Sequence, residues 1–398
     1  MLKRMTKSPK LSSKARTIFY WSLIPVLVFF FSEDMRQTIV GGYAMMVDEM
    51  KIKYIVLFIS FVAIYVSSPV DLILRNKFSP EAKFFWIAFG TLLCTTVYFQ
   101  LYEGFHSESI NEFLYLLVPF IFVSCIVSSN QDVSKNLIEV CFVLTLFCYL
   151  TTVIHKILYG YSVTDITLES SFSPFENELS PYFVYFEIYY LFQNDRKRSL
   201  LCLLLTFLSL KRFCLLKATV FYILFAYTNY RTINKKLYWG TVACFMVAPF
   251  LILSIYTNQS VISWVEQITG RDIDSFTMSR YTIVQHVLNG IDSVNFGFGT
   301  TVYVLKDWAA KSLHSDVLRL YLEGTFLSTI VYTYAYFKFV RNYNLFTFLV
   351  IFHIFSEGLF NHWMFGAGIT CQWIIIYLII YTINRHGESL ETVKYRFK

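Results

Sequence analysis

Apolar residues recur along the chain in stretches of about 15–20 residues, separated by short polar breaks, as bilayer-spanning helices require. The pattern predicts an all-α polytopic membrane protein with about twelve transmembrane helices. Their expected positions are 17–31, 54–74, 84–101, 113–128, 137–158, 180–193, 199–210, 213–228, 237–256, 317–337, 345–361 and 368–384. Spans shorter than about 17 residues need tilt, a locally thin bilayer or burial against neighbouring helices.

The segment 180–228 admits two interpretations: three short spans, or one span followed by a single long helix through 199–228. With three spans and both termini inside, the inner connections and the two termini together hold 22 Lys and Arg residues, whereas the outer segments hold 10. Cytoplasmic loops carry this excess of basic residues. The single long helix would place Arg231, Lys235 and Arg341 on the outer face. We therefore expect three spans here and cytoplasmic termini.

The predicted spans divide the chain into four parts. Residues 1–256 hold spans one to nine and an acidic external loop near 159–179; residues 257–316 form a large extracytoplasmic (periplasmic) loop; residues 317–384 hold spans ten to twelve; and residues 385–398 form a cytoplasmic tail. A structureless connection as long as 257–316 is uncommon in a compact protein. This loop between spans nine and ten is therefore expected to be functional.

Composition supports a membrane protein. Hydrophobic residues make up 56% and charged residues only 15% of the chain, whereas soluble domains carry about 25% charged residues. The basic residues behind the net charge of +7 are distributed as the expected membrane topology predicts. The charge therefore does not indicate a nucleic-acid partner. The 8 cysteines lie in apolar segments without metal-ligand spacing, so neither a disulfide framework nor a metal site is expected.

The large loop carries an arginine on an apolar helix face. Ser275 can cap a helix over Phe276–Asn289, with Gly290 just past its end. Arg280 falls within the apolar stripe of that helix. It is either a snorkelling arginine at the membrane interface or a phosphate ligand, because guanidinium groups match phosphate oxygens. The following Gly297-Phe-Gly299 is more typical of a structural turn than of a phosphate-binding loop.

A histidine stands just before the tenth span. Either Ser312 or Ser315 can cap the helix that follows, which puts His314 and Asp316 at its outward end. The helix dipole disfavours a positively charged imidazole at that end. A neutral imidazole can act as a general base, so His314 is the candidate base.

Further ionisable residues continue the same helix face into the span. Arg319 and Glu323 follow Asp316, and Arg319 can pair with either carboxylate. Ionisable residues inside a membrane are costly, so they indicate function by default. The alternative is an ion-pair ladder that holds the span against a neighbouring helix.

Other candidates lie in two external turns. Lys211 and Arg212 separate two apolar segments and are expected on the outer side. The positive-inside rule predicts few cations on that side, so their position is unusual. With Lys217 on the next helix they suit a diphosphate; the alternative is snorkelling to lipid headgroups. His362, near Glu357, faces outside in the last external turn and is a secondary candidate for support, more typical of a structural histidine.

The order of these features resembles the O-antigen polymerase (Wzy) and O-antigen ligase superfamily. The local match consists of Ser279-Arg280, Gly297-Phe-Gly299 and the segment His314–Gly324. Arg212 resembles the family arginine that is assigned to the lipid-linked diphosphate. Family members often have Asn after the histidine and one residue between the Glu and the Gly, and this chain departs from both patterns.

The resemblance implies a GT-C-like, metal-independent glycosyltransferase without a cofactor in the bacterial cytoplasmic (inner) membrane. It would transfer a growing glycan from one undecaprenyl diphosphate to a repeat unit on a second, and so polymerise the glycan of lipopolysaccharide or of another surface polysaccharide. His314 would be the base, oriented by Asp316, with support from Glu323 and His362. The diphosphate would be bound by basic residues: Lys211, Arg212, Arg280 and Arg319. Candidate partners besides membrane lipid are a chain-length regulator and a flippase.

Other functions fit parts of the pattern. A ligase of the same superfamily, which transfers the glycan to lipid A–core or another terminal acceptor, would use the same residues. A flippase for the lipid-linked units would need ionisable residues along a central path from both sides, whereas the unusual cations and the histidine are expected on the outer side. A non-catalytic scaffold gives no reason for Arg212 and Arg280.

Overall fold

The computed structural model describes most of the chain from residue 80 onward. The described ranges are 80–129, 131–158, 160–161, 173–176, 179–209, 211–228, 230–277, 279–308, 313–362, 364–366 and 370–396. The predicted spans at 17–31 and 54–74, most of the acidic loop near 159–179, and Ser312 lie outside the described residues.

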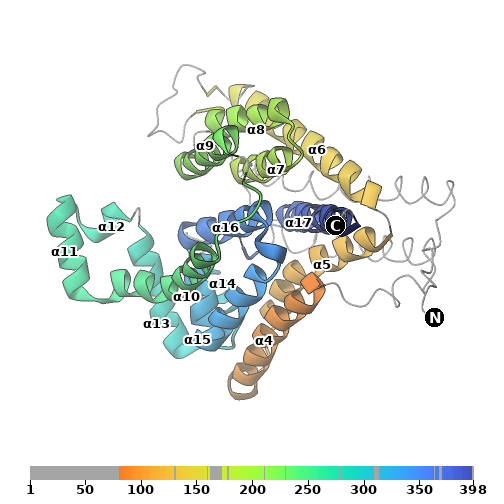
Figure 1. The fold of residues 1–398 in the computed structure, drawn as a ribbon. Helices are drawn as coiled ribbons and strands as arrows, with labels where there is room; N and C mark the ends of the chain where they lie inside the picture. Colours follow the sequence, from red (N-terminus) through yellow and green to blue (C-terminus); the bar gives the residue numbers. More distant parts are fainter. Residues whose placement is uncertain are drawn as a thin grey trace, which may run out of the picture.

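The described chain is built from helices (Figure 1). Helix makes up 81% of the structure and the described residues contain no strand, which confirms the all-α class. The helices are α4 (Pro80–Glu103), α5 (Glu108–Ser129), α6 (Gln131–Leu158), α7 (Ser180–Phe192), α8 (Arg196–Leu208), α9 (Arg212–Tyr227), α10 (Lys235–Thr257), α11 (Gln259–Thr269), α12 (Ile273–Phe276), α13 (Arg280–Ser293), α14 (Thr300–Val304), α15 (Asp316–Phe337), the 3₁₀-helix η2 (Arg341–Tyr343), α16 (Leu345–Phe360) and α17 (Thr370–Arg396).

Helices occupy every predicted span that falls within the described ranges. The segment 199–228 is divided, because α8 ends at Leu208 and α9 begins at Arg212, so a single long helix there is excluded. In the described part of the chain, 3 helices are long and apolar enough to cross a membrane: Pro80–Glu103, Ser134–Leu158 and Lys235–Thr257. This is the pattern of a helical membrane protein.

The centre of the fold is formed by α7 and α17. α17 packs against α5, α6, α7 and α16, and its residues from Cys371 to Ile380 are all buried. α7 is buried from Ser180 to Leu191. Such helices are apolar on every side because every side contacts protein. The peripheral helices α4 and α10 instead expose large apolar side chains such as Val97 and Leu251, which suit a lipid environment.

The connections between helices gather at two ends of the molecule, because successive long helices alternate in direction. We call the end that contains 104–107, 173–176, 211, 258–277, 279–308, 313–315, 361–362 and 364–366 the loop end, and the end that contains 193–195, 230–234 and 338–344 the basic end. Hydrogen bonds join separate connections at each end. At the basic end the Ile233 N–H donates to the Tyr343 carbonyl (2.8 Å), and at the loop end the Asp316 N–H donates to the Asn361 carbonyl (3.3 Å).

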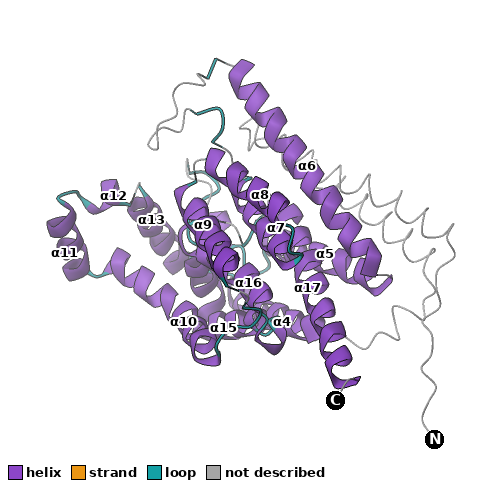
Figure 2. Ribbon diagram, turned by 45° about the horizontal axis from the view of Figure 1, so that its top comes forward, coloured by secondary structure: helices purple, strands orange, loops and turns teal. Residues whose placement is uncertain are grey.

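The predicted large loop is folded into the short helices α11 to α14, and α11 and α12 project to one side of the bundle (Figures 1 and 2). The helix expected over Phe276–Asn289 is displaced. α13 begins at Arg280, because Ser279 adopts a left-handed conformation (φ 62°), and Gly290 lies inside the helix rather than past its end. The helix begins later than predicted because Ser279 adopts a backbone conformation that is rare for Ser and that the sequence pattern does not indicate.

Ser275 was expected to cap that helix but lies within α12. Its backbone N–H donates to the Asp272 carboxylate (2.9 Å), so Asp272 is the residue that caps α12. A side-chain hydrogen bond from Ser275, joined by the backbone one, holds the pKa of the Asp272 carboxyl below its ordinary value. The predicted apolar stripe persists in Ile283, Val284 and Val287, which pack near the start of α15.

Candidate functional site

The start of α15 is fixed to the turn that follows α16. Ser315 caps α15, since its Oγ accepts a hydrogen bond from the Leu318 N–H (3.3 Å). The Asp316 carboxylate accepts a hydrogen bond from the Met364 N–H (2.5 Å), and the Asp316 N–H donates to the Asn361 carbonyl (3.3 Å). Asp316 is buried, so this carboxylate holds two chain segments together beneath the loop end.

These contacts bring His314 and His362 together. The centroids of their rings are 5.2 Å apart with one ring edge-on to the other, and both side chains are half-buried. One histidine precedes the cap of α15 and the other follows the end of α16. Both residues were predicted from sequence as site candidates, but their spacing along the chain contains no signal of this pairing. A partly exposed imidazole can serve as a general base, so this pair is the candidate proton acceptor.

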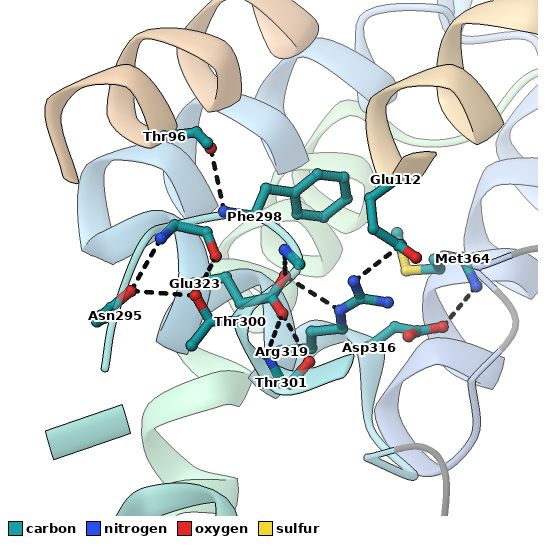
Figure 3. A network of polar contacts seen from close by, with 12 residues as sticks. Thr96, Glu112, Asn295, Phe298, Thr300, Thr301, Asp316, Arg319, Glu323 and Met364 are labelled. Atoms are coloured by element: carbon teal, nitrogen blue, oxygen red, sulfur yellow. Dashed lines mark hydrogen bonds and ion pairs between the residues drawn. The ribbon is translucent and has the colours of Figure 1, made fainter. Parts of the chain in front are cut away.

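Arg319 lies one turn further along α15, buried between two glutamates (Figure 3). Its Nη2 donates to Glu112 of α5 (2.8 Å) and its Nε donates to Glu323 (3.1 Å). The exposed fraction of the side chain is 6% for Arg319, 6% for Glu112 and 0% for Glu323. These contacts support the ion-pair alternative for Arg319 and Glu323, because both carboxylates bond to a guanidinium that is almost fully buried among the described residues. Glu112 was not among the residues predicted from sequence to belong to the site.

The Gly297–Gly299 turn is held by side chains from three elements (Figure 3). Its backbone donors all bond within the protein: Gly297 to Asn295 Oδ1 (3.1 Å), Phe298 to Thr96 Oγ1 (3.0 Å) and Gly299 to Glu323 Oε2 (3.1 Å). A phosphate-binding loop needs such N–H groups to point at its ligand. The hydrogen bonds therefore support a structural turn, which fixes the loop to α4 and α15.

Replacing Gly297 with alanine is expected to destabilise the protein by about 1–3 kcal/mol or more, because backbone strain and a steric clash combine. The φ of Gly297 is +89°, and an added Cβ would lie 2.7 Å from the Thr96 Cα. Thermal unfolding of the purified protein in detergent measures the effect. Gly270→Ala is the matched control, since Gly270 also has a positive φ (+65°) but has nothing within 4 Å of the added Cβ. Equal losses in both variants would contradict close packing of the turn.

A second buried ion pair connects α9 to the histidine turn. Lys217 of α9 is bonded to Glu357 of α16, and its Nζ also donates to the Ser356 Oγ (3.0 Å). The other carboxylate oxygen of Glu357 accepts a hydrogen bond from the Asn361 side chain (3.0 Å). The exposed fraction of the side chain is 6% for Lys217 and 2% for Glu357. Lys217 is thus bound within the protein, and Glu357 holds the residue that precedes His362.

The remaining predicted cations lie on other elements of the loop end. Lys211 precedes α9, is partly exposed and forms an ion pair with Glu176 (3.6 Å). Arg212 is the first residue of α9 and is exposed. Arg280 is half-buried at the first position of α13 and interacts electrostatically with Tyr256 of α10. These three cations lie at the same end of the molecule as the histidines, where Lys211 contacts Glu176 and Arg280 interacts with Tyr256.

Comparison of the chain with protein-family models, with curated proteins and with solved structures finds no match. The interpretation of the site therefore depends on its own geometry and chemistry.

Proposed function

We propose that the protein is a polysaccharide polymerase of the bacterial cytoplasmic membrane. In this proposal its spans number about twelve, both termini are cytoplasmic and the loop end faces outward. The observation that carries the proposal is the pairing of His314 with His362 at the end that also presents Lys211, Arg212 and Arg280. A base and separate cations at one end of a membrane protein suit group transfer from a lipid-linked diphosphate.

The reaction is a glycosyl transfer between two lipid-linked substrates. The hydroxyl oxygen of the acceptor sugar forms a bond to the anomeric carbon of the donor glycan, and the bond from that carbon to the diphosphate oxygen breaks. His314 takes the hydroxyl proton. Undecaprenyl diphosphate leaves with the bonding electrons, and cations stabilise its growing negative charge. Exposed Arg212 and half-buried Arg280 can contact a ligand, whereas Arg319 acts in this proposal as a structural residue.

The test is the pattern of surface glycans in a strain that lacks the gene. We expect the deletion to leave one repeat unit on each lipid anchor, with the full ladder restored by the wild-type gene, when glycans are separated on a gel. Bare anchor together with accumulated lipid-linked polymer would instead identify a ligase. An unchanged ladder would refute both enzymes.

A flippase is the second candidate, favoured by ionisable residues within the helical bundle. Besides the Lys217–Glu357 pair, α7 carries Glu187 and α16 carries His353, and both side chains are fully buried. Neither oxygen of the Glu187 carboxyl has a hydrogen-bond partner among the described residues. Buried ionisable groups in a membrane are typical of transport paths. A flippase predicts that the deletion strain accumulates single lipid-linked units on the inner face and carries no surface glycan.

A further inference from the structure

A pocket lies at the basic end, opposite the paired histidines. The turn between α7 and α8, the end of α9, the connection to α10 and the start of α16 surround it. Its lining includes Asn194, Arg196, Phe225, Tyr230, Arg231 and Phe346. Aromatic and aliphatic side chains thus meet two arginines in one pocket, which has no role in the proposed transfer reaction.

Arg231 is held in a fixed orientation without losing its charge. Its guanidinium donates to the Phe192 carbonyl (3.1 Å) and to the Asn194 side-chain oxygen (2.7 Å), and it lies 5.0 Å from the centroid of the Phe346 ring. The Arg231 carbonyl accepts a hydrogen bond from the Leu345 N–H (2.9 Å), so the backbone is fixed as well. All of these partners are uncharged. A preorganised guanidinium loses little conformational freedom when it binds an anion.

The positive charge of the pocket is not neutralised by nearby carboxylates. Asp195, which precedes Arg196 in the chain, and Glu139 of α6 both pair with Arg198 (3.4 Å and 2.7 Å). Arg196 and Arg231 are exposed and form no ion pair with a carboxylate among the described residues. An anionic ligand would supply the missing charge, and a phosphodiester matches the guanidinium donors.

An apolar ridge on α8 starts at the same arginine. Leu200, Leu204 and Phe207 follow Arg196 at intervals of four, four and three residues, so they share one helix face. Their exposed fractions are 42%, 51% and 55%. A ligand with its anionic group at Arg196 can therefore lay a hydrocarbon chain along this ridge. A soluble phosphate would leave the ridge uncovered.

We propose that this pocket binds an anionic phospholipid, with its phosphate between Arg196 and Arg231 and one acyl chain along Leu200, Leu204 and Phe207. Basic pockets between membrane helices on the cytoplasmic side bind anionic headgroups. The same end carries the basic residues that the positive-inside rule assigns to the cytoplasm. The inference does not depend on the proposed polymerase reaction.

Native mass spectrometry of the purified full-length protein in detergent tests the proposal. Phosphatidylglycerol and phosphatidylcholine with identical acyl chains are compared, together with glycerophosphoglycerol, the same phosphodiester headgroup without acyl chains. We expect phosphatidylglycerol to bind and the other two to bind at least about tenfold more weakly. Equal binding of the two lipids would overturn the proposal. Glycerophosphoglycerol that binds as tightly as phosphatidylglycerol would overturn it in favour of a site for soluble anions.

The double variant Arg196→Gln/Arg231→Gln is expected to weaken phosphatidylglycerol binding by at least about tenfold. Lys235→Gln/Lys236→Gln is the matched control, because it removes the same charge from exposed positions of the same end outside the pocket lining. We expect the control to bind like wild type. Equal losses in both double variants would show diffuse attraction to the basic end and would overturn the specific site. If the arginine variant fails to fold, the comparison of lipids on the wild-type protein still decides whether the pocket prefers an anionic phospholipid.

Discussion

Replacing His314 with alanine is expected to abolish polymer formation while the folded protein remains in the membrane. Loss of a general base slows a reaction by about 10²–10⁴-fold, which is enough to remove the glycan ladder. His314 is only half-buried and precedes α15, so its truncation leaves the cap at Ser315 and the buried Asp316 contacts in place. The ladder is measured by gel in the deletion strain complemented with the variant, and the amount of protein by immunoblot of membranes.

His286→Ala is the matched control for this experiment. His286 is an exposed histidine of the same large loop, and its ring stacks on that of Trp308 at a centroid distance of 4.0 Å. It makes no described contact with the paired histidines, so we expect a normal ladder. A normal ladder from His314→Ala, at wild-type protein level, would refute His314 as the base. A missing ladder from both variants would point to a general effect of altering the loop.

Much of the helical arrangement could be predicted because hydrophobic run length is a local property of the sequence. The division of 199–228 into two helices could also be inferred from the basic residues that interrupt or flank the runs. The cap at Ser315 was predicted as one of two choices, because a serine before a helix is a local signal as well. The start of α13 could not be predicted, since the left-handed conformation of Ser279 is fixed by its surroundings in the fold.

The hydrogen-bond partners of Arg319 and of the Gly297–Gly299 turn could not be predicted from sequence for a related reason. Glu112 is 207 residues from Arg319 in sequence, and hydrophobic periodicity contains no information about which distant polar residues meet. The same holds for Thr96, which bonds to the Gly297–Gly299 turn from α4. The sequence predicted that Arg319 can form an ion pair with either Asp316 or Glu323 on the same helix. In the structure Arg319 donates hydrogen bonds to Glu323 and to Glu112 of α5, whereas the Asp316 carboxylate accepts one from the Met364 N–H.

Replacing Arg319 with methionine is expected to destabilise the folded protein by about 3–5 kcal/mol. The variant leaves Glu112 and Glu323 buried without their cation, and an unpaired buried charge costs far more than a lost surface contact. Because Glu323 also accepts hydrogen bonds from Gly299 and Thr301, loss of the ion pair loosens the attachment of the large loop. The effect is measured as a lower melting temperature of the purified protein in detergent and a lower yield from membranes.

Arg271→Met is the matched control for the loss of stability expected in Arg319→Met. Arg271 is an exposed arginine of the large loop between α11 and α12, so its replacement removes the same charge without exposing a buried carboxylate. We expect the melting temperature of that variant to remain near the wild-type value. If Arg319→Met melts like wild type but yields no polymer, Arg319 contacts substrate and the structural assignment is wrong. If Arg319→Met loses both stability and polymer, whereas His314→Ala loses polymer alone, Arg319 has a structural role and His314 takes part in the reaction.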